Sequence, residues 1–457
     1  MMPRTSIAMA GVQHRALRAH LFPGDGLEAA AILLCARGPG HRSRYVVREV
    51  MLVPHADCFQ RTPDFVSWPG AWLERAIDQG ERDGLALILA HSHPGGLLGF
   101  SDRDDTSDRI TVSSLFQAYG RAHGSAIMVP DGTVLPRLYD PDMAVRPVDL
   151  VTVVGDDIVF QLAGAPKRAP AFTSGMTDVL ARLSAVVIGV SGTGTVVAEQ
   201  AARLGFGRVI LIDFDRIERR NLNRILNSTR ADAAAELLKV AAFARAITEY
   251  RGPDVAIPVP ASIDTRDAVI AAAQGDVLFS CVDTLHARQI ADLMASAFVM
   301  PLFDMGVTIP ARTDTLGEVS IIDAVGRIDY VQPGGSSLRT RGVYTPKTLR
   351  AEYLADVAPE AHAIELAAGY IDGAVEQAPS VISLNMRAAS AAMNEFILRA
   401  FPFRLDPNRG YARTRFSLAG GDEDHFDEDD FAVGSDKLLG RGGTEPLLRL
   451  PRLGVPE

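Results

Sequence analysis

The sequence predicts an α/β protein with two domains, of which the second has a Rossmann-like, doubly wound parallel sheet. Its 457 residues exceed the size of one ordinary hydrophobic core. After residue 171 the pattern becomes strand, glycine-rich turn, helix and strand, which indicates a right-handed parallel βαβ unit. Residues 163–171, AGAPKRAPA, contain two prolines and no apolar periodicity, so we expect a linker there.

The region before this linker, residues 1–162, is expected to mix helices with strands. Its strands are short apolar or β-branched runs, and its helices have apolar residues spaced four apart. The expected helices are 13–22 and 68–80, and the expected strands are 29–35, 45–53, 85–90, 126–129 and 151–161.

The region after the linker, residues 172–403, is expected to form the doubly wound domain. Its expected strands are 185–189, 208–213, 277–281 and 302–304, and its expected helices are 196–204 and 380–400. Residues 404–457 contain the acidic run GDEDHFDEDD (421–430), and we expect a poorly ordered tail. A docking site for a basic partner is the alternative for this run.

Composition excludes several classes of protein. The net charge is −10 and no Lys/Arg-rich face stands out, which argues against a nucleic-acid partner. The apolar runs are too short for a membrane span, and no signal sequence is evident. The three cysteines form no CxxC pair, so neither a disulfide framework nor a structural zinc cluster is indicated. We therefore expect a soluble, cytoplasmic protein.

Two histidines follow a short apolar strand, in the sequence HSHP (91–94), and the chain continues to Ser101 and Asp104. Two imidazoles and one carboxylate leave one position of a tetrahedral zinc ion open for water, as in catalytic zinc sites. Such a water needs a carboxylate as general base, and Ser101 could donate a hydrogen bond to a developing oxyanion. The HxH spacing alone would also suit an ordinary loop, but the whole set predicts a hydrolytic zinc site.

The sequence HSHPGGLLGFSDRD (91–104) resembles the JAMM signature HxHP…SxxD of JAB/MPN metalloproteases, which cut isopeptide or peptide bonds after ubiquitin-like proteins. The resemblance covers residues 1–162 and implies a mixed-sheet α/β domain. It implies His91, His93 and Asp104 as zinc ligands, Ser101 as oxyanion helper and Glu28 as general base, because the family has a glutamate before its first central strand.

Glu49 is the alternative base, but it follows the strand rather than opening it, so we favour Glu28. Because every catalytic position of the signature is retained, we expect an active enzyme. Cys35 and Cys58 are expected to be structural.

The doubly wound region contains a glycine-rich loop, GVSGTG, with Gly189, Gly192 and Gly194 between a strand and a helix. Glycines there let the backbone approach a phosphate at the helix N-terminus. The next strand ends at Asp213, where an acidic group typically binds ribose hydroxyls, and Asp215 follows as a second cofactor-binding candidate. These features predict a nucleotide site, and on their own they would also suit a redox Rossmann enzyme.

Charged residues beyond the loop argue against redox chemistry. Asn221, Arg224, Lys239 and Asp283 follow in order. Cations that converge on a triphosphate, with an aspartate to hold magnesium, suit attack at the α-phosphate, whereas hydride transfer needs no such cations.

This order resembles the ThiF/MoeB/ubiquitin-activating family, whose pattern is GxGGxG…DxDxVxxxNLxRQ…K…D. Here it stands as GVSGTG…DFDRIERRNLNRI…K…D, over residues 170–400. Family members adenylate the C-terminal glycine of a ubiquitin-like protein with MgATP. The resemblance implies Asp213 at the ribose, Asn221, Arg224 and Lys239 at the phosphates, and Asp283 on magnesium; Arg224, Lys239 and Asp283 would be catalytic.

The sequence departs from the family pattern in several places. Ser191 replaces the second glycine, Ile225 replaces the glutamine, and no arginine-bearing arm is evident, although Arg168 or Arg182 could substitute. No cysteine follows Cys281, which lies in a strand and is expected to be structural. We therefore expect the domain to stop at the acyl-adenylate and to pass it to a thiol on another protein, such as a cysteine-bearing conjugating enzyme.

Both sites would act on the C-terminus of a ubiquitin-like protein. The favoured hypothesis is a bacterial ubiquitin-like conjugation system, in which the protease matures a precursor or reverses conjugation; similar gene sets are implicated in antiviral (antiphage) defence. One alternative is activation and trimming of a sulfur carrier for cofactor or amino-acid synthesis, and another is a catalytically silent scaffold. The expected cofactors are Zn²⁺, ATP and Mg²⁺, and the family implies a homodimer.

Overall fold

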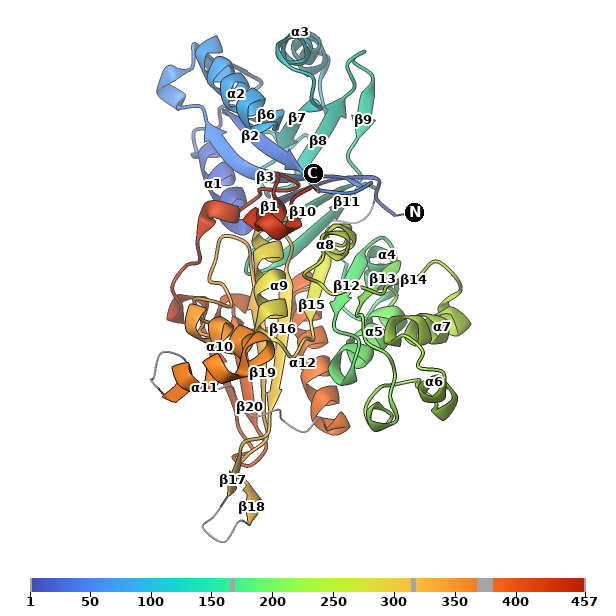
Figure 1. Ribbon diagram of the computed structural model, residues 1–457. Coiled ribbons are helices and arrows are strands. Elements are labelled where there is room, and N and C mark those ends of the chain that lie inside the picture. The colour runs from blue at the N-terminus through green and yellow to red at the C-terminus, as the bar shows by residue number, and fades with distance from the viewer. Residues whose placement is uncertain (1, 165–168, 314–317, 368–380, 456–457) are drawn as a thin grey trace.

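The computed structural model describes residues 2–164, 169–313, 318–367 and 381–455, and Figure 1 shows two α/β domains that pack directly on each other. The expected linker lies partly outside the described residues, which omit 165–168. Within the described residues, no helix combines the length and the apolar character that a bilayer span requires.

The N-terminal domain is built on a nine-stranded mixed sheet in the order β11-β10-β1-β3-β2-β6-β7-β8-β9. Three strand pairs are parallel, β1 with β10, β1 with β3 and β6 with β7, and the other neighbours are antiparallel. The strands are β1 (Thr5–Ala10), β2 (Ala30–Arg37), β3 (Ser43–Leu52), β6 (Ala86–Ser92), β7 (His123–Met128), β8 (Val134–Tyr139), β9 (Val145–Pro147), β10 (Leu150–Val154) and β11 (Ile158–Leu162). The mixed sheet expected from the sequence is therefore present.

Three helices and a small hairpin complete this domain. The helices are α1 (Gly11–Leu21), α2 (Gly70–Asp83) and α3 (Asp102–Ala118), and the hairpin joins β4 (Gln60–Thr62) to β5 (Phe65–Ser67). Two separate cores pack on the faces of the sheet. The sequence did not predict α3, because only Val112 and Leu115 are buried apolar residues in it.

The C-terminal domain contains an eight-stranded sheet in the order β14-β13-β12-β15-β16-β19-β20-β21. Its first five strands are parallel and doubly wound, as predicted, and the last three are antiparallel additions. The strands are β12 (Ser184–Ile188), β13 (Arg208–Ile212), β14 (Ala256–Val259), β15 (Val277–Ser280), β16 (Leu302–Thr308), β19 (Val325–Val331), β20 (Arg413–Ser417) and β21 (Glu423–Phe426).

Helices cover both faces of this sheet, because its central strands are apolar on both sides. On β12, Ala185 and Val187 belong to one core, while Val186 and Ile188 belong to the other. The helices are α4 (Ser174–Leu180), α5 (Gly192–Leu204), α6 (Arg230–Ala234), α7 (Lys239–Arg251), α8 (Arg266–Ala272), α9 (Leu285–Ala297), α10 (Pro346–Val357), α11 (Pro359–Ala367) and α12 (Ile382–Ala400). The hairpin of β17 (Ala311–Thr313) and β18 (Val319–Ile321) projects away from the N-terminal domain (Figure 1).

The poorly ordered tail expected over residues 404–457 is not what the structure contains. β20 and β21 extend the sheet, and Leu447, Leu448 and Leu453 are buried in the core formed with α8 and α9. The acidic run pairs with arginines of the same domain: Glu428 contacts Arg341 at 2.8 Å, with both side chains buried. The order of this segment could not be predicted from its acidic run, because the composition of the run does not reveal which arginines lie opposite it.

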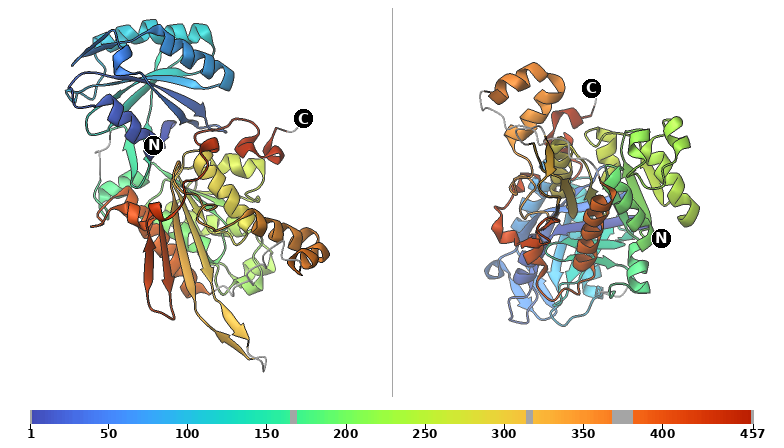
Figure 2. Two further views of the ribbon diagram at one scale, coloured as in Figure 1. Left: turned by 90° about the vertical axis from the view of Figure 1, so that its left-hand side faces the viewer. Right: turned by 90° about the horizontal axis from the view of Figure 1, so that it is seen from below.

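The two domains share a buried interface, and Figure 2 shows the C-terminal segment passing between them. Arg44 on β3 is 1% exposed, and it donates to the carbonyl oxygens of Phe298 and Val299 in the other domain. Leu439 of the C-terminal segment packs against the N-terminal core, to which Val299 also belongs. Buried contacts at this interface thus join the two domains, each of which carries one of the candidate sites.

Candidate functional site

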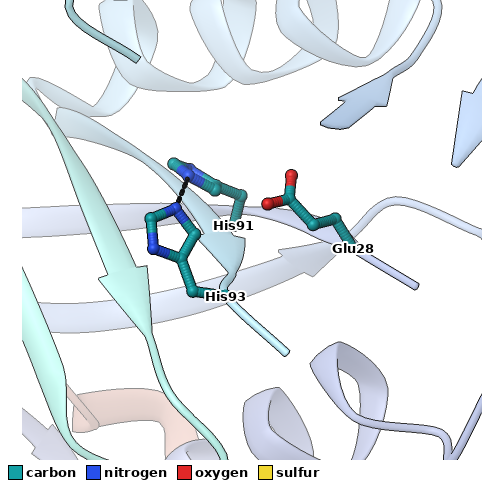
Figure 3. A group of neighbouring side chains, drawn as sticks. All are labelled: Glu28, His91 and His93. Atoms are coloured by element: carbon teal, nitrogen blue, oxygen red, sulfur yellow. Dashed lines mark hydrogen bonds between the residues drawn. The ribbon is translucent and has the colours of Figure 1, made fainter. Parts of the chain in front are cut away.

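Two histidines and a glutamate converge at one end of the N-terminal sheet (Figure 3). His91 is on β6, and His93 follows that strand. The β2–β6 register places Ala30 opposite His91, so Glu28 lies beside the histidines just before β2 begins. One ligand atom from each of the three side chains lies within 4.8 Å of the others, and the Nε2 atoms of the two histidines are 3.0 Å apart.

Asp104 reaches the same histidines from the first turn of α3. Its Oδ1 lies 3.2 Å from Nε2 of His91, and its Oδ2 lies 3.6 Å from Nε2 of His93. Burial opposes ionisation, but hydrogen bonds with both histidines outweigh it and hold the pKa of Asp104 well below its usual range. Two imidazole nitrogens facing one ionised carboxylate fit a zinc ion.

The hydrogen bonds around these groups favour metal binding through Nε2. Nδ1 of His93 lies 2.8 Å from the carbonyl oxygen of Leu97, an interaction that orients a ligand imidazole. Ser92, between the two histidines, accepts a hydrogen bond from the backbone N–H of Ala29 at 2.9 Å, and so ties β6 to the strand that follows Glu28. Ser92 was not predicted as a site residue, although its position between His91 and His93 could have indicated a role at the site.

Glu28 has the environment of a proton-transfer group. Burial raises its pKa to about 7, because the charged carboxylate is poorly solvated there. Arg61 donates from Nε to the Glu28 carbonyl oxygen at 2.8 Å, and the Glu28 N–H donates to Thr62. The alternative base, Glu49, is exposed on β3 and hydrogen-bonds to Gln79, so the structure brings Glu28 rather than Glu49 to the histidines.

Ser101 is the N-cap of α3. Its hydroxyl donates to Oδ2 of Asp104 at 2.8 Å and accepts from the Asp104 N–H at 3.2 Å. This capping box orients the Asp104 carboxylate, an interaction that the sequence analysis did not anticipate.

The nucleotide candidates lie at the carboxyl ends of the parallel strands in the second domain, where doubly wound folds bind ligands. Gly189 directly follows β12 and has φ +85°, and a Cβ on Gly194 would lie 1.7 Å from the Gly189 carbonyl oxygen. Gly192 begins α5. The loop therefore needs glycine at positions 189 and 194 in order to fold back onto the start of the helix.

Asp213 holds this loop together. Its carboxylate accepts hydrogen bonds from the N–H groups of Val190 at 2.7 Å and Asp215 at 2.8 Å. Burial raises the pKa of Asp213, although nearby Lys239 opposes that shift. The ammonium group of Lys239 contacts Asp215 at 2.6 Å, so the structure brings three of the predicted residues together.

Among the described residues, the remaining candidates do not contact this group directly. Asn221 is buried, and its side-chain oxygen accepts from the Glu218 N–H at 3.0 Å. Arg224 donates to the carbonyl oxygen of Arg220 at 3.1 Å. Asp283 is exposed beyond β15, at the same edge of the sheet.

A buried network supports the loop that carries Asp283. Arg288 donates to the carbonyl oxygen of Val282 at 2.7 Å and contacts Asp304, which in turn accepts from Ser280 at 2.7 Å. This network was not predicted, because a single arginine in the sequence gives no sign of burial.

Two of the residues noted as departures from the family pattern, Cys281 and Arg182, lie in the described part of the chain and have defined surroundings. Burial raises the pKa of the Cys281 thiol well above its usual range, which suits a structural residue. Arg182 donates to the carbonyl oxygen of Ala163, and Arg168 lies outside the described residues.

The two sheets and the residues at their strand ends define a fusion of two α/β domains, the second of them doubly wound. A family model of prokaryotic homologs of the JAB domain matches residues 12–140, and the ThiF family model matches residues 165–328. The chain therefore carries a JAB-type domain followed by a ThiF family domain, which confirms both resemblances seen in the sequence.

Similar proteins include ubiquitin-like modifier-activating enzyme 5 of Drosophila persimilis, which is 30% identical over 164 residues, or 33% of this chain and 38% of that enzyme. The enzyme of the same name from Caenorhabditis briggsae is 31% identical over 160 residues, or 32% of this chain and 33% of the relative. The matched part thus spans less than two-fifths of either relative.

Solved structures with a similar fold include E. coli MccB with MccA-N7isoASN. That comparison has a TM-score of 0.43 and 16% identity, and it covers 55% of this chain and 66% of the other. E. coli MccB with ATP gives a TM-score of 0.42 and 15% identity, with 58% of this chain and 68% of the other covered.

Proposed function

We propose that this protein adenylates the C-terminal glycine of a ubiquitin-like protein with MgATP and, in its other domain, cleaves the peptide or isopeptide bond after such a protein. The observation that carries the proposal is that one chain holds the histidine–glutamate group at a strand end of one domain and the glycine loop with Asp213, Asp215 and Lys239 at the strand ends of the other. The ThiF family match supports the use of ATP, and the ubiquitin-like modifier-activating relatives support the class of substrate.

In the adenylation reaction, the carrier's terminal carboxylate would attack the α-phosphate of ATP, and pyrophosphate would leave. Lys239, Arg224 and Asn221 would bind the phosphates, Asp213 the ribose, and Asp283 the magnesium ion. The paired Lys239 and Asp215 are 2.6 Å apart and would separate as phosphates and magnesium enter.

In the cleavage reaction, His91, His93 and Asp104 would hold zinc, which polarises the scissile carbonyl and lowers the pKa of water. Glu28 would accept the proton of the attacking water and pass it to the leaving amine, tasks that suit a carboxyl group with a pKa of about 7. Ser101 would stabilise the oxyanion by turning its one hydroxyl proton from Asp104 to the substrate, while its oxygen still accepts from the Asp104 N–H.

The product of the first domain would be transferred to a separate protein. The sequence contains no cysteine after Cys281, which is partly buried beside the glycine loop. The acceptor would be a cysteine-bearing conjugating enzyme of a cytoplasmic, bacterial ubiquitin-like system, of the kind that similar gene sets place in antiviral defence. The protein would act as a homodimer.

ATP–pyrophosphate exchange with candidate ubiquitin-like proteins tests the adenylation step. Exchange should depend on the carrier and fall about 100-fold in Asp283→Ala, because the metal carboxylate is lost. A carrier that ends as a thiocarboxylate would favour sulfur transfer over conjugation. If ATP binds but no carrier supports exchange, the protein is a scaffold rather than an activating enzyme.

Replacement of Cys281 tests whether the domain forms its own thioester. Cys281→Ser should change the exchange rate by less than about twofold, because a partly buried thiol with a raised pKa has no nucleophilic role. Non-reducing electrophoresis of the wild type with carrier and ATP should show no thiol-sensitive adduct. An adduct that disappears in Cys281→Ser would contradict transfer to a separate protein.

A further inference from the structure

A buried polar cluster connects α3, the helix that carries Asp104, to the central sheet. Its members are Asp105 and Asp108 on α3, Ser125 on β7, and Arg137 and Tyr139 on β8. The Arg137 guanidinium donates to Asp105 at 2.6 Å and to Asp108 at 2.7 Å. Tyr139 donates to the same oxygen of Asp108 at 2.8 Å, and Ser125 also donates to it.

The cluster replaces the apolar anchor that the start of this helix lacks. Across residues 102–111, all of them described, no apolar side chain is buried, and Ile110 is 69% exposed. Asp108, which is 6% exposed, is the buried side chain of this stretch, and apolar burial begins only at Val112. The first turns of α3 are therefore held to the sheet mainly by charge-assisted hydrogen bonds.

The helix geometry connects this cluster to Asp104. Asp108 lies four residues after Asp104, so the two side chains share one face of the helix, and Asp105 is the next residue in the same turn. Arg137 also stacks on Phe100, the residue before Ser101, with its guanidinium carbon 3.6 Å from the ring centroid. Arg137 thus contacts Phe100, just before the N-cap, and also Asp105 and Asp108, in the first two turns of the helix.

We infer that Arg137 is a positioning residue, which fixes the rotation and height of α3 so that the Asp104 carboxylate meets His91 and His93. The planar guanidinium holds Asp105 and Asp108 in a fixed geometry, which the flexible ammonium group of a lysine would not reproduce. Partners of this kind around a metal ligand typically contribute 10- to 100-fold to metal affinity. This inference rests on the proposed zinc site and adds a residue to it that no motif identifies.

The test is the zinc affinity of the full-length protein, measured by competition with a chromophoric chelator. The wild type should bind one zinc ion per chain through this site, and Arg137→Met should bind it roughly 10- to 100-fold more weakly. Arg137→Lys should restore only part of that loss. Asp105→Asn is a milder change at a half-exposed position and serves as the substitute if Arg137→Met proves too unstable to purify. It should weaken zinc binding about 10-fold.

Two further measurements separate positioning from general destabilisation. The visible spectrum of the cobalt-substituted protein should change in the Arg137 variants, because the Asp104 ligand shifts, whereas loss of stability alone leaves the spectrum of the folded protein unchanged. Arg146→Met on β9 removes a neighbouring arginine whose contact with Asp140 is 3.7 Å long and partly exposed, and it should match the wild type.

The possible failures are distinct. If the wild type binds no zinc, the proposed metalloprotease is wrong and the positioning role falls with it. If the wild type binds zinc and the Arg137 variants bind it equally well with an unchanged cobalt spectrum, only the role of Arg137 is overturned.

Discussion

Glu28→Gln is expected to lower the rate of bond cleavage by about a thousandfold, because it removes the general base without removing a zinc ligand. The carboxylate lies beside both histidines and is desolvated, which raises its pKa to about 7. Glutamine has nearly the same shape, so the backbone contacts of residue 28 with Thr62 and Arg61 should persist. A fusion of a ubiquitin-like protein to a fluorescent reporter would measure the rate.

The matched control is Glu49→Gln, which changes the competing carboxylate of the same domain. It should leave the rate within about twofold, because Glu49 is exposed and bonded to Gln79 rather than to the site. Zinc content should be equal in the two variants, and pyrophosphate exchange should be unaffected in both. Full cleavage by Glu28→Gln together with loss in Glu49→Gln would reverse the assignment of the base.

Sequence patterns predicted those features of the fold and the site whose geometry is determined by one short stretch of chain. The alternation of strand, glycine loop and helix identified the doubly wound sheet, since Gly189 after β12 and Gly194 in the first turn of α5 each meet a local steric demand. The HxHP spacing predicted the histidine pair for the same reason. Glu28 required the family resemblance, because its approach to His91 depends on the pairing of two strands that are distant in sequence.

Features that depend on long-range pairing of charges could not be predicted. Most of the acidic run 421–430 is exposed, as expected, but Glu428 is 7% exposed against a buried arginine from another part of the chain. Arg137 gave no signal, because an isolated arginine in a strand usually points to solvent. Burial of a charge is visible only once its partner is known, and these partners come from distant parts of the chain.

The largest expected effect on stability is at the interface between the domains, where buried charges depend on partners from distant parts of the chain. Asp276, which is fully buried, faces Arg42 at 2.8 Å and Arg44 at 3.4 Å, and their side chains are 7% and 1% exposed. Its other oxygen accepts from the Ser184 N–H at 2.9 Å, at the start of β12. One carboxylate therefore balances two buried guanidinium groups and caps the central strand of the second domain.

Asp276→Ala should lower the free energy of unfolding by about 3–5 kcal/mol, because it leaves both arginines buried without a counter-charge. Urea denaturation monitored separately by cleavage and by pyrophosphate exchange would measure it, and both midpoints should fall, since the interface belongs to both domains. Asp140→Ala, at an exposed ion pair, should change stability by less than about 0.5 kcal/mol. A fall confined to one activity would mean that the domains unfold independently, and unchanged midpoints would mean that solvent reaches the arginines once the carboxylate is gone.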